Sequence, residues 1–427
     1  MSNGLGVESV AILLRWLVEP SSRDFELSNL IVVTAMNGKE WPDTIQNFEK
    51  FMLPMFRAHQ IRFVQVGRGG RSQSDGVAVL DDTRAPTKLF AQGAYTLLQE
   101  LLTSGTVPQF GGSKHLCSLK FKAFAIEKWL QENIEGFIRH TFGYNCGEQS
   151  RINDSEAAIR ARVTFGFNPQ ELTRISDAQS YDRPSRQGHY PLAEWGWNRD
   201  RCLDYIFEEL GVVWRKSACP FCPFARITPE LIARQHEFSE ETAAAMFLER
   251  VALAINPRSQ LYKQKPLYQV AEESGNRAAL AVFDQLMAVS PWALYRVRRI
   301  YRAKGIYTGE GKAKILVAYD PGHKGTADRC VERVKDLPDR NTAIVHLREL
   351  AVEKNVALRH EHGLQYLPIS SCGPMYPTRE EFWVAAPAVV DTKARYGVAE
   401  FDFEWKRLFD PDSREQLPLF CKEKSCL

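Results

Sequence analysis

The sequence lacks any apolar run that approaches the roughly 20 residues needed to cross a membrane, so we expect no membrane-spanning segment. It also lacks a basic stretch followed by an apolar core near its start, so we expect no secretory signal and a cytoplasmic protein. The formal net charge is only +3, which does not by itself indicate a nucleic-acid partner. We find no internal repeat and no low-complexity tract.

The composition is that of an ordinary globular protein, with 44% apolar and 25% charged residues. A chain of 427 residues is long enough for two domains. Disulfides are rare in the cytosol, so the nine cysteines are expected to be reduced thiols or metal ligands.

Residues 2–9 combine glycines and serines immediately before an apolar helical pattern. Gly4 and Gly6 have no side chain, so backbone N–H groups there can approach an anion, and the hydroxyls of Ser2 and Ser9 add donors. The start of the helix contributes a favourable dipole. The pattern indicates a phosphate-binding loop at a helix N-terminus.

Residues 30–35 and 61–66 are short apolar runs with β-branched residues, as in buried parallel strands, and a helical pattern over 45–59 lies between them. This alternation predicts an α/β fold in which helices cover both faces of a parallel sheet. Ligands of such sheets bind beyond the carboxyl ends of the strands, where residues 2–9 would lie. A loop of this kind usually follows a strand, yet only one residue precedes it. Either the first strand lies outside this sequence or the sheet is built without it.

The pattern changes near residue 230. Residues 228–290 have a helical pattern, and residues 314–319 resemble a strand. We therefore expect a nucleotide-binding domain over residues 1–227. Residues 228–427 are expected to form a mainly helical α+β accessory domain that binds a substrate or partner.

Several motifs follow one another in the order of a known family. They occupy residues 2–9, 38–44, 117–122, 143–151, 190–197 and 216–224. On these motifs the chain resembles the phosphoadenosine phosphosulfate (PAPS) reductase-like branch of the adenine nucleotide α-hydrolases, the PP-loop or N-type ATP pyrophosphatases. The resemblance covers residues 1–226 and implies a Rossmann-like, HUP-type sheet. Two departures are Glu8 in place of the usual Asp and Asn3 in place of Gly.

The resemblance implies that the protein binds ATP, or PAPS or adenosine phosphosulfate, together with Mg²⁺. It places the nucleotide contacts at Ser2, Gly4, Gly6, Ser9, Glu40, Thr44, Lys122, Glu148 and Arg151. It implies catalytic roles for Glu8, Lys120 and Cys219, with Glu8 orienting a Mg²⁺-bound water.

Each of these roles has a plainer alternative. Glu8 would be favoured at a helix N-terminus without any catalytic role. Lys120 and Lys122 are two residues apart and do not share a helix face, so only one is expected to reach a phosphate. Glu148 and Arg151 would form an ion pair, either closing the nucleotide site or simply on the surface.

The two-residue gap between Cys219 and Cys222 allows both thiolates to reach one metal ion. Cys117 and Cys202 are candidates for the remaining ligands, and together the four cysteines would form a [4Fe–4S] site such as several relatives carry. A structural zinc suits four cysteines equally well. Four reduced cysteines without a metal are the third alternative.

A basic segment in the second half contains Arg296, Arg298, Arg299, Arg302 and Lys304. If the segment is helical, pairs of these arginines share a face and could follow a nucleic-acid backbone. A solvated helix face is the alternative.

The C-terminal tail ends in Cys426-Leu427 and could deliver a thiol, although it lacks the E-C-G-x-H signature of PAPS reductases.

Three functions remain open at this stage. The first is an ATP-dependent enzyme that adenylates a substrate and transfers sulfur to it, with a nucleic acid as acceptor and a cysteine desulfurase as partner. The second is a sulfonucleotide reductase that uses thioredoxin and releases sulfite. The third is a degenerate nucleotide-binding subunit of a DNA-modification or phage-defence complex.

Overall fold

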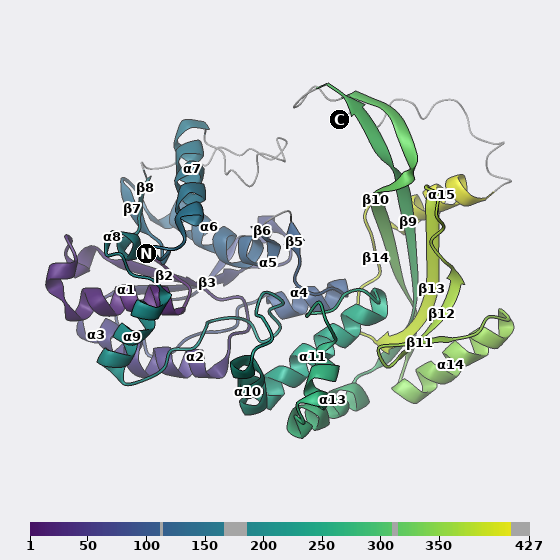
Figure 1. Ribbon diagram of the computed structural model, residues 1–427, viewed down its shortest axis with the longest axis horizontal. Helices are drawn as coiled ribbons and strands as arrows, with labels where there is room; N and C mark the ends of the chain where they lie inside the picture. The colour runs from purple at the N-terminus through teal and green to yellow at the C-terminus, as the bar shows by residue number, and fades with distance from the viewer. Residues whose placement is uncertain (112–113, 166–185, 310–314, 411–427) are drawn as a thin grey trace. The chain divides into compact units, whose positions relative to one another are not determined.

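The computed structural model describes residues 1–111, 114–165, 186–309 and 315–410 (Figure 1). The chain divides into two compact units, each described separately below. The first contains residues 1–100 and 108–225, and the second contains residues 101–107 and 226–427. The sequence pattern placed the division two residues later, after residue 227.

The first unit is built on a four-stranded sheet of order β1-β2-β3-β4, in which β1, β2 and β3 are parallel and β4 is antiparallel to β3. The strands of this unit are β1 (Ser2–Asn3), β2 (Ile31–Ala35), β3 (Arg62–Arg68), β4 (Val77–Thr83), β5 (Phe110–Gly111), β6 (Lys114–His115), β7 (Ile138–Thr141) and β8 (Arg186–His189). The first strand is therefore present, but it is only two residues long. Strands β7 and β8 form a separate parallel pair.

Helices connect these strands. They are α1 (Val7–Val18), α2 (Pro42–Asn47), α3 (Leu53–Ala58), α5 (Leu116–Ser118), α6 (Phe124–Asn133), α7 (Gln149–Phe165), α8 (Pro191–Glu194) and α9 (Arg199–Leu210). Two π-helical turns, η3 (Phe48–Met52) and η5 (Leu119–Ala123), join α2 to α3 and α5 to α6. Helix α4 (Leu97–Ser104) crosses the boundary between the units.

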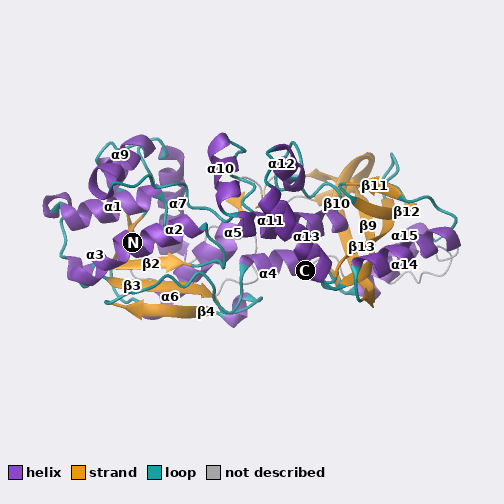
Figure 2. Ribbon diagram, turned by 90° about the horizontal axis from the view of Figure 1, so that it is seen from below, coloured by secondary structure: helices purple, strands orange, loops and turns teal. Residues whose placement is uncertain are grey.

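Alternation along the strands accounts for the two covered faces of this sheet. Val32 and Phe63 belong to a core with α1, α3 and α9, whereas Val33 and Val64 pack with Trp129 of α6. Figure 2 shows α1, α2 and α3 together on one side of β2, β3 and β4. The predicted α/β class with parallel strands is confirmed at this level.

The second unit contains more sheet than the sequence indicated. Its helices are α10 (Pro229–Glu237), α11 (Ser239–Ile255), α12 (Leu267–Glu273), α13 (Arg277–Val289), α14 (Arg340–Glu353) and α15 (Val398–Phe409). Its strands are β9 (Trp292–Thr308), β10 (Ile315–Leu337), β11 (Arg359–Glu361), β12 (Leu364–Ser370), β13 (Thr378–Pro387) and β14 (Lys393–Ala394). The helical pattern expected over 228–290 corresponds to α10–α13.

These strands form one antiparallel sheet of order β11-β12-β13-β9-β10-β14. Helix α11 packs on one face through Val251 and Ile255, and α15 packs on the other through Phe401. Strands β9 and β10 extend as a ribbon beyond Tyr301, the last residue of β9 that pairs with β13 (Figure 1).

Within the described part of the chain, every helix is too short or too polar to cross a membrane.

Candidate functional site

The loop between β1 and α1 is held in place by the side chain of Asn3. This residue is buried, its Nδ2 donates to Thr34 Oγ1 of the neighbouring strand at 3.1 Å, and its Oδ1 accepts from the N–H of Leu5 at 3.0 Å. Leu5 has a φ of 60°, a conformation that is uncommon outside glycine. The Asn that departs from the family motif thus fixes the turn and joins it to β2.

The loop leaves its outer side open at the start of α1. A Cβ added to Gly4 would have no atom within 4 Å, whereas one added to Gly143 would lie 3.1 Å from the backbone nitrogen of Ser9. Gly6 is the N-cap of α1, and Ser9 is buried with its hydroxyl donating to the carbonyl of Gly6 at 3.0 Å. The first N–H groups of a helix have no partner within the helix, so this end can attract an anion.

Glu40 connects this loop to the segment that carries the paired cysteines. One carboxylate oxygen of Glu40 accepts from the Ser217 hydroxyl at 2.7 Å, and the other accepts from the Ala218 N–H at 2.7 Å. The same Ser217 hydroxyl lies 2.9 Å from the carbonyl oxygen of Gly4 and can donate to it. Burial raises the pKa of Glu40, against the opposing influence of Lys122.

A narrow hollow lies between the loop and the end of β2. Its volume is about 10 Å³, which is space for roughly one water molecule. The residues around it come from the loop, from β2 and the turn after it, from η5 and from the segment between β4 and α4: Gly4, Leu5, Thr34, Ala35, Met36, Asn37, Lys39, Glu40, Ala91 and Lys122. A nucleotide phosphate needs more room than this, so it would have to bind over the open side of Gly4 or move these side chains.

The two lysines of η5 differ in their surroundings. Lys120 Nζ forms an ion pair with Glu100 at 2.7 Å, whereas Lys122 lines the hollow. No carboxylate of the described residues forms an ion pair with Lys122, although its charge lowers the pKa values of Glu40 and Cys219 against the larger effect of burial. Lys122 is therefore the lysine placed to meet an anion at the loop.

Cys219 is next to the same edge of the sheet. Its sulfur accepts from Asn37 Nδ2 at 3.1 Å, and the N–H of Cys222 donates to the carbonyl of Cys219 at 3.0 Å. Burial raises the pKa of Cys219 to about 12 and also raises that of Cys222. Both residues are therefore thiols rather than thiolates at neutral pH.

The four cysteines predicted to share a metal are not assembled as one site. Cys117 and Cys219 both lie close enough to Cys222 for its charge to raise their pKa values. Cys202, however, is fully buried in the core between α1 and α9, where burial and the charge of Glu8 raise its pKa to about 12. No group of three or more His, Cys, Asp or Glu side chains among the described residues could hold a metal ion. The four thiols do not fit a [4Fe–4S] or tetrahedral zinc site in this arrangement.

Other predicted site residues have local partners. Glu8 accepts from Arg199 Nη1 of α9 at 2.6 Å. Thr44 is buried in the first turn of α2 and is not among the residues around the hollow.

Glu148 and Arg151 do form the expected ion pair, across the start of α7. The guanidinium of Arg151 lies 4.4 Å from the ring centre of Tyr144. Glu148 and Arg151 are three residues apart, so this ion pair is local to the start of α7.

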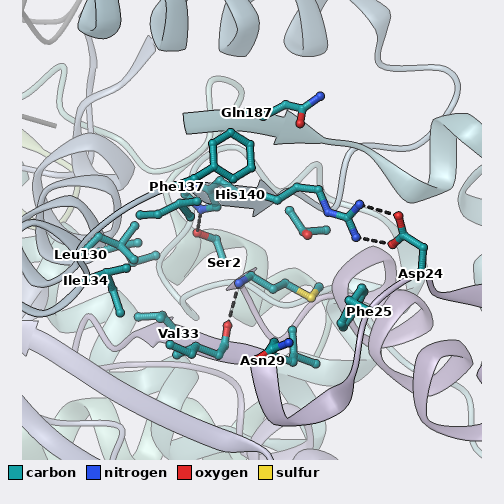
Figure 3. Close-up of a pocket in the computed structure, with 17 residues that line it drawn as sticks. Ser2, Asp24, Phe25, Asn29, Val33, Leu130, Ile134, Phe137, His140 and Gln187 are labelled. Atoms are coloured by element: carbon teal, nitrogen blue, oxygen red, sulfur yellow. Dashed lines mark hydrogen bonds and ion pairs between the residues drawn. The ribbon is translucent and has the colours of Figure 1, made fainter. Parts of the chain in front are cut away.

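Ser2 belongs to a different cavity, shown in Figure 3. Its hydroxyl lies 2.6 Å from His140 Nε2 on β7, and residues of β2 and of β7 both line the cavity, which has a volume of about 470 Å³. Leu130 and Phe137 are part of its apolar lining (Figure 3). The hydroxyl of Ser2 therefore contacts β7, and Ser2 is not among the residues around the hollow at the loop.

The basic segment is a strand and not the helix that we expected. All five of its cationic residues lie in β9. Arg296 pairs with Glu381 at 2.7 Å, Arg298 with Glu332 at 2.7 Å, and Arg299 with Glu380.

Arg302 of the same strand pairs with Asp328 at 3.0 Å and Glu404 at 2.7 Å, while Lys304 is exposed. Neighbouring strands and α15 thus neutralise most of the positive charge. Arg296 and Arg298 are two residues apart and line one hollow together with Asp402, whereas the adjacent Arg299 lies on the other face of the strand, so the five cations do not form one surface. Cys426 of the tail lies outside the described residues.

Three residues at the site were not predicted as ligands: Asn37, Lys39 and Ser217. Asn37 and Lys39 follow the end of β2 directly, the position at which parallel sheets bind ligands. That position was the available sequence signal for both residues. Ser217 lies in the motif at residues 216–224, but its role depends on contacts with residues about two hundred positions away, which the motif does not show.

Comparison of the chain with protein-family models, with curated proteins and with solved structures finds no match.

Proposed function

We propose that the first unit binds ATP at the loop of residues 4–9 and uses it to activate a substrate for sulfur transfer at Cys219. The observation that supports this best is the bridge from Gly4 through Ser217 to Glu40, because it joins the loop to the cysteine segment. A thiol that can carry a persulfide beside a phosphate-binding loop suits a reaction in which a nucleotide activates one partner and sulfur attacks it. The motif resemblance to PP-loop enzymes points to the same chemistry.

Phosphate binding in this proposal has two components. The first-turn N–H groups of α1 and its dipole attract the anion. The ammonium group of Lys122 adds a full positive charge at the hollow. Mg²⁺ would accompany ATP as its counter-ion, and Glu8 could meet it only after leaving Arg199.

The proposed reaction has two transfers. A substrate oxygen attacks the α-phosphorus of ATP and releases pyrophosphate. The outer sulfur of a persulfide on Cys219, loaded by a cysteine desulfurase, then attacks the activated carbon and displaces AMP.

The product of the second step is joined to Cys219 by a disulfide. The Cys222 thiol gives its proton to a base from the solution and its sulfur attacks the Cys219 sulfur, which releases the thiolated product and leaves a Cys219–Cys222 disulfide. A dithiol reductant such as thioredoxin restores both thiols, so electrons and sulfur balance.

The test uses the full chain with ATP, Mg²⁺, a cysteine desulfurase with free cysteine, and bulk tRNA or sheared DNA as the trial acceptor. We expect pyrophosphate release that depends on the acceptor, and sulfur incorporation that is lost in Cys219→Ser while ATP binding is kept. Sulfite release from PAPS with reduced thioredoxin would instead identify a sulfonucleotide reductase. ATP binding without turnover on any acceptor would favour a nucleotide-binding subunit.

A further inference from the structure

The second unit contains a cavity of about 480 Å³ next to a buried arginine. Three elements form its wall: α11, α12 with the proline before it, and the turn between β11 and β12. The lining residues are Met246, Glu249, Arg250, Leu253, Pro266, Tyr268, Gln269, Glu272, His362 and Gly363.

Arg250 is only 8% exposed, yet no carboxylate of the described residues forms an ion pair with it. Its Nη1 makes one long hydrogen bond, 3.4 Å, to the carbonyl of Gly363. Its guanidinium lies 5.0 Å from the ring centre of Tyr268 and 5.3 Å from that of Phe283. Aromatic faces attract a cation but leave its N–H groups without acceptors. A guanidinium that is nine-tenths buried beside a cavity is therefore short of an anion.

The acidic groups around the cavity do not supply that anion. Both oxygens of Glu249 are occupied, because they accept from the N–H groups of Leu261 at 2.6 Å and Leu267 at 2.5 Å. Glu272 is exposed at the rim and acts on Tyr268, whose pKa is raised mainly by burial. The charge of Arg340 adds to the positive potential at Arg250.

The turn between β11 and β12 lies directly against the guanidinium of Arg250. His362 and Gly363 both have positive φ, 52° and 69°, as in a two-residue type I′ hairpin. A Cβ on Gly363 would lie 2.7 Å from Arg250 Nη1, so glycine allows the guanidinium its position. The imidazole of His362 is turned to the carbonyl of Pro257, at 3.1 Å.

We propose that this cavity binds a small organic carboxylate, with Arg250 holding the carboxylate and Met246, Leu253 and Pro266 contacting an apolar remainder. One guanidinium matches one carboxylate in charge and in its two-pronged geometry. A phosphate dianion would require further cations, and the lining provides only Arg250 as a permanent one. The proposal concerns a site other than the nucleotide loop and does not depend on the function proposed above.

The test titrates the full-length protein with sodium benzoate by calorimetry and by thermal unfolding, at constant ionic strength. Acetate, inorganic phosphate and chloride serve as comparison anions. We expect saturable benzoate binding, weaker acetate binding, and no more effect from phosphate than from chloride.

Arg250→Met should weaken benzoate binding tenfold or more, because it removes charge-assisted hydrogen bonds. Arg250→Lys keeps the charge and should weaken binding less, which provides a folded variant if Arg250→Met is unstable. Arg348→Met, at an exposed arginine of α14, should bind as the wild type does. The proposal would be overturned if the wild-type protein did not bind benzoate or preferred phosphate. It would also be overturned if either Arg250 variant bound benzoate as tightly as the wild type.

Discussion

Glu40 accepts a hydrogen bond of 2.7 Å from the hydroxyl of Ser217, although 177 residues separate the two in the sequence. This contact joins the turn after β2 to the segment before Cys219. Ala218, which follows Ser217, donates its N–H to the carboxylate of Glu40 as well. The position of the cysteine pair thus depends on one half-buried acid at the edge of the parallel sheet.

We expect Glu40→Ala to destabilise the first unit by about 1–3 kcal/mol, because two donors lose their acceptor. The segment around Cys219 should also open, so that Cys219 reacts faster with iodoacetamide. Urea unfolding and peptide mass spectrometry measure the two effects. Glu135→Ala, at an exposed position, is the control and should change neither. Unchanged stability in Glu40→Ala would show that the bridge does not hold the segment.

Gly4 provides a variant that separates folding from binding. A Cβ at this position would meet no atom within 4 Å, so the free energy of unfolding of Gly4→Val should lie within about 0.5 kcal/mol of that of the wild type. The added methyl groups project into the open side of the loop and should weaken ATP binding at least tenfold. Gly211→Val, at the left-handed end of α9 with a φ of 66°, should show the reverse, with lost stability and retained binding. Thermal unfolding and ATP titration measure both.

The half-buried thiol of Cys219, whose pKa is raised, predicts slow alkylation. With a pKa of about 12, roughly one molecule in ten thousand is a thiolate at pH 8. Its alkylation rate should rise about tenfold for each pH unit above 8 while the protein stays folded. The exposed Cys372 provides the comparison and should react first at pH 8. Labelling of Cys219 as fast as Cys372 at that pH would contradict the description of the site.

Glu249 predicts a pH dependence of stability in the second unit. Burial raises the pKa of Glu249 from 4.5 to about 7, so between these values the folded state holds a proton that the unfolded state has lost. Stability should therefore fall as the pH rises from 4.5 to 7, by roughly 3 kcal/mol. Glu249→Gln cannot titrate and should remove this slope, although it also loses one hydrogen-bond acceptor. Denaturant unfolding at several pH values gives the slopes, and equal slopes in both proteins would refute the prediction.

Several elements of the first unit could be predicted from local sequence alone. The apolar run 30–35 became β2, the run 61–66 became most of β3, and the glycine-rich loop precedes α1 as expected. These predictions succeeded because strand and helix periods are encoded in neighbouring residues.

The errors arose where the decisive partners are distant in sequence. The basic segment became a strand because its arginines meet carboxylates such as Glu332 and Glu381, 34 and 85 residues away. Cys202 falls on the apolar face of α9, so it packs in the core instead of joining Cys219. The spacing showed that Cys219 and Cys222 are near each other, but it could not show on which face of its helix Cys202 lies.

The central claim is that the loop of residues 4–9 and Lys122 bind the phosphates of an adenine nucleotide. Calorimetric titration of ATP into the wild-type protein, Lys122→Met and Lys128→Met tests it most directly. Lys128 pairs with Glu132 on the surface of α6 and serves as the matched control. The account predicts that the wild type and Lys128→Met bind ATP alike and that Lys122→Met binds at least tenfold more weakly. Failure of the wild type to bind ATP, AMP or PAPS, or equal binding by Lys122→Met, would contradict it.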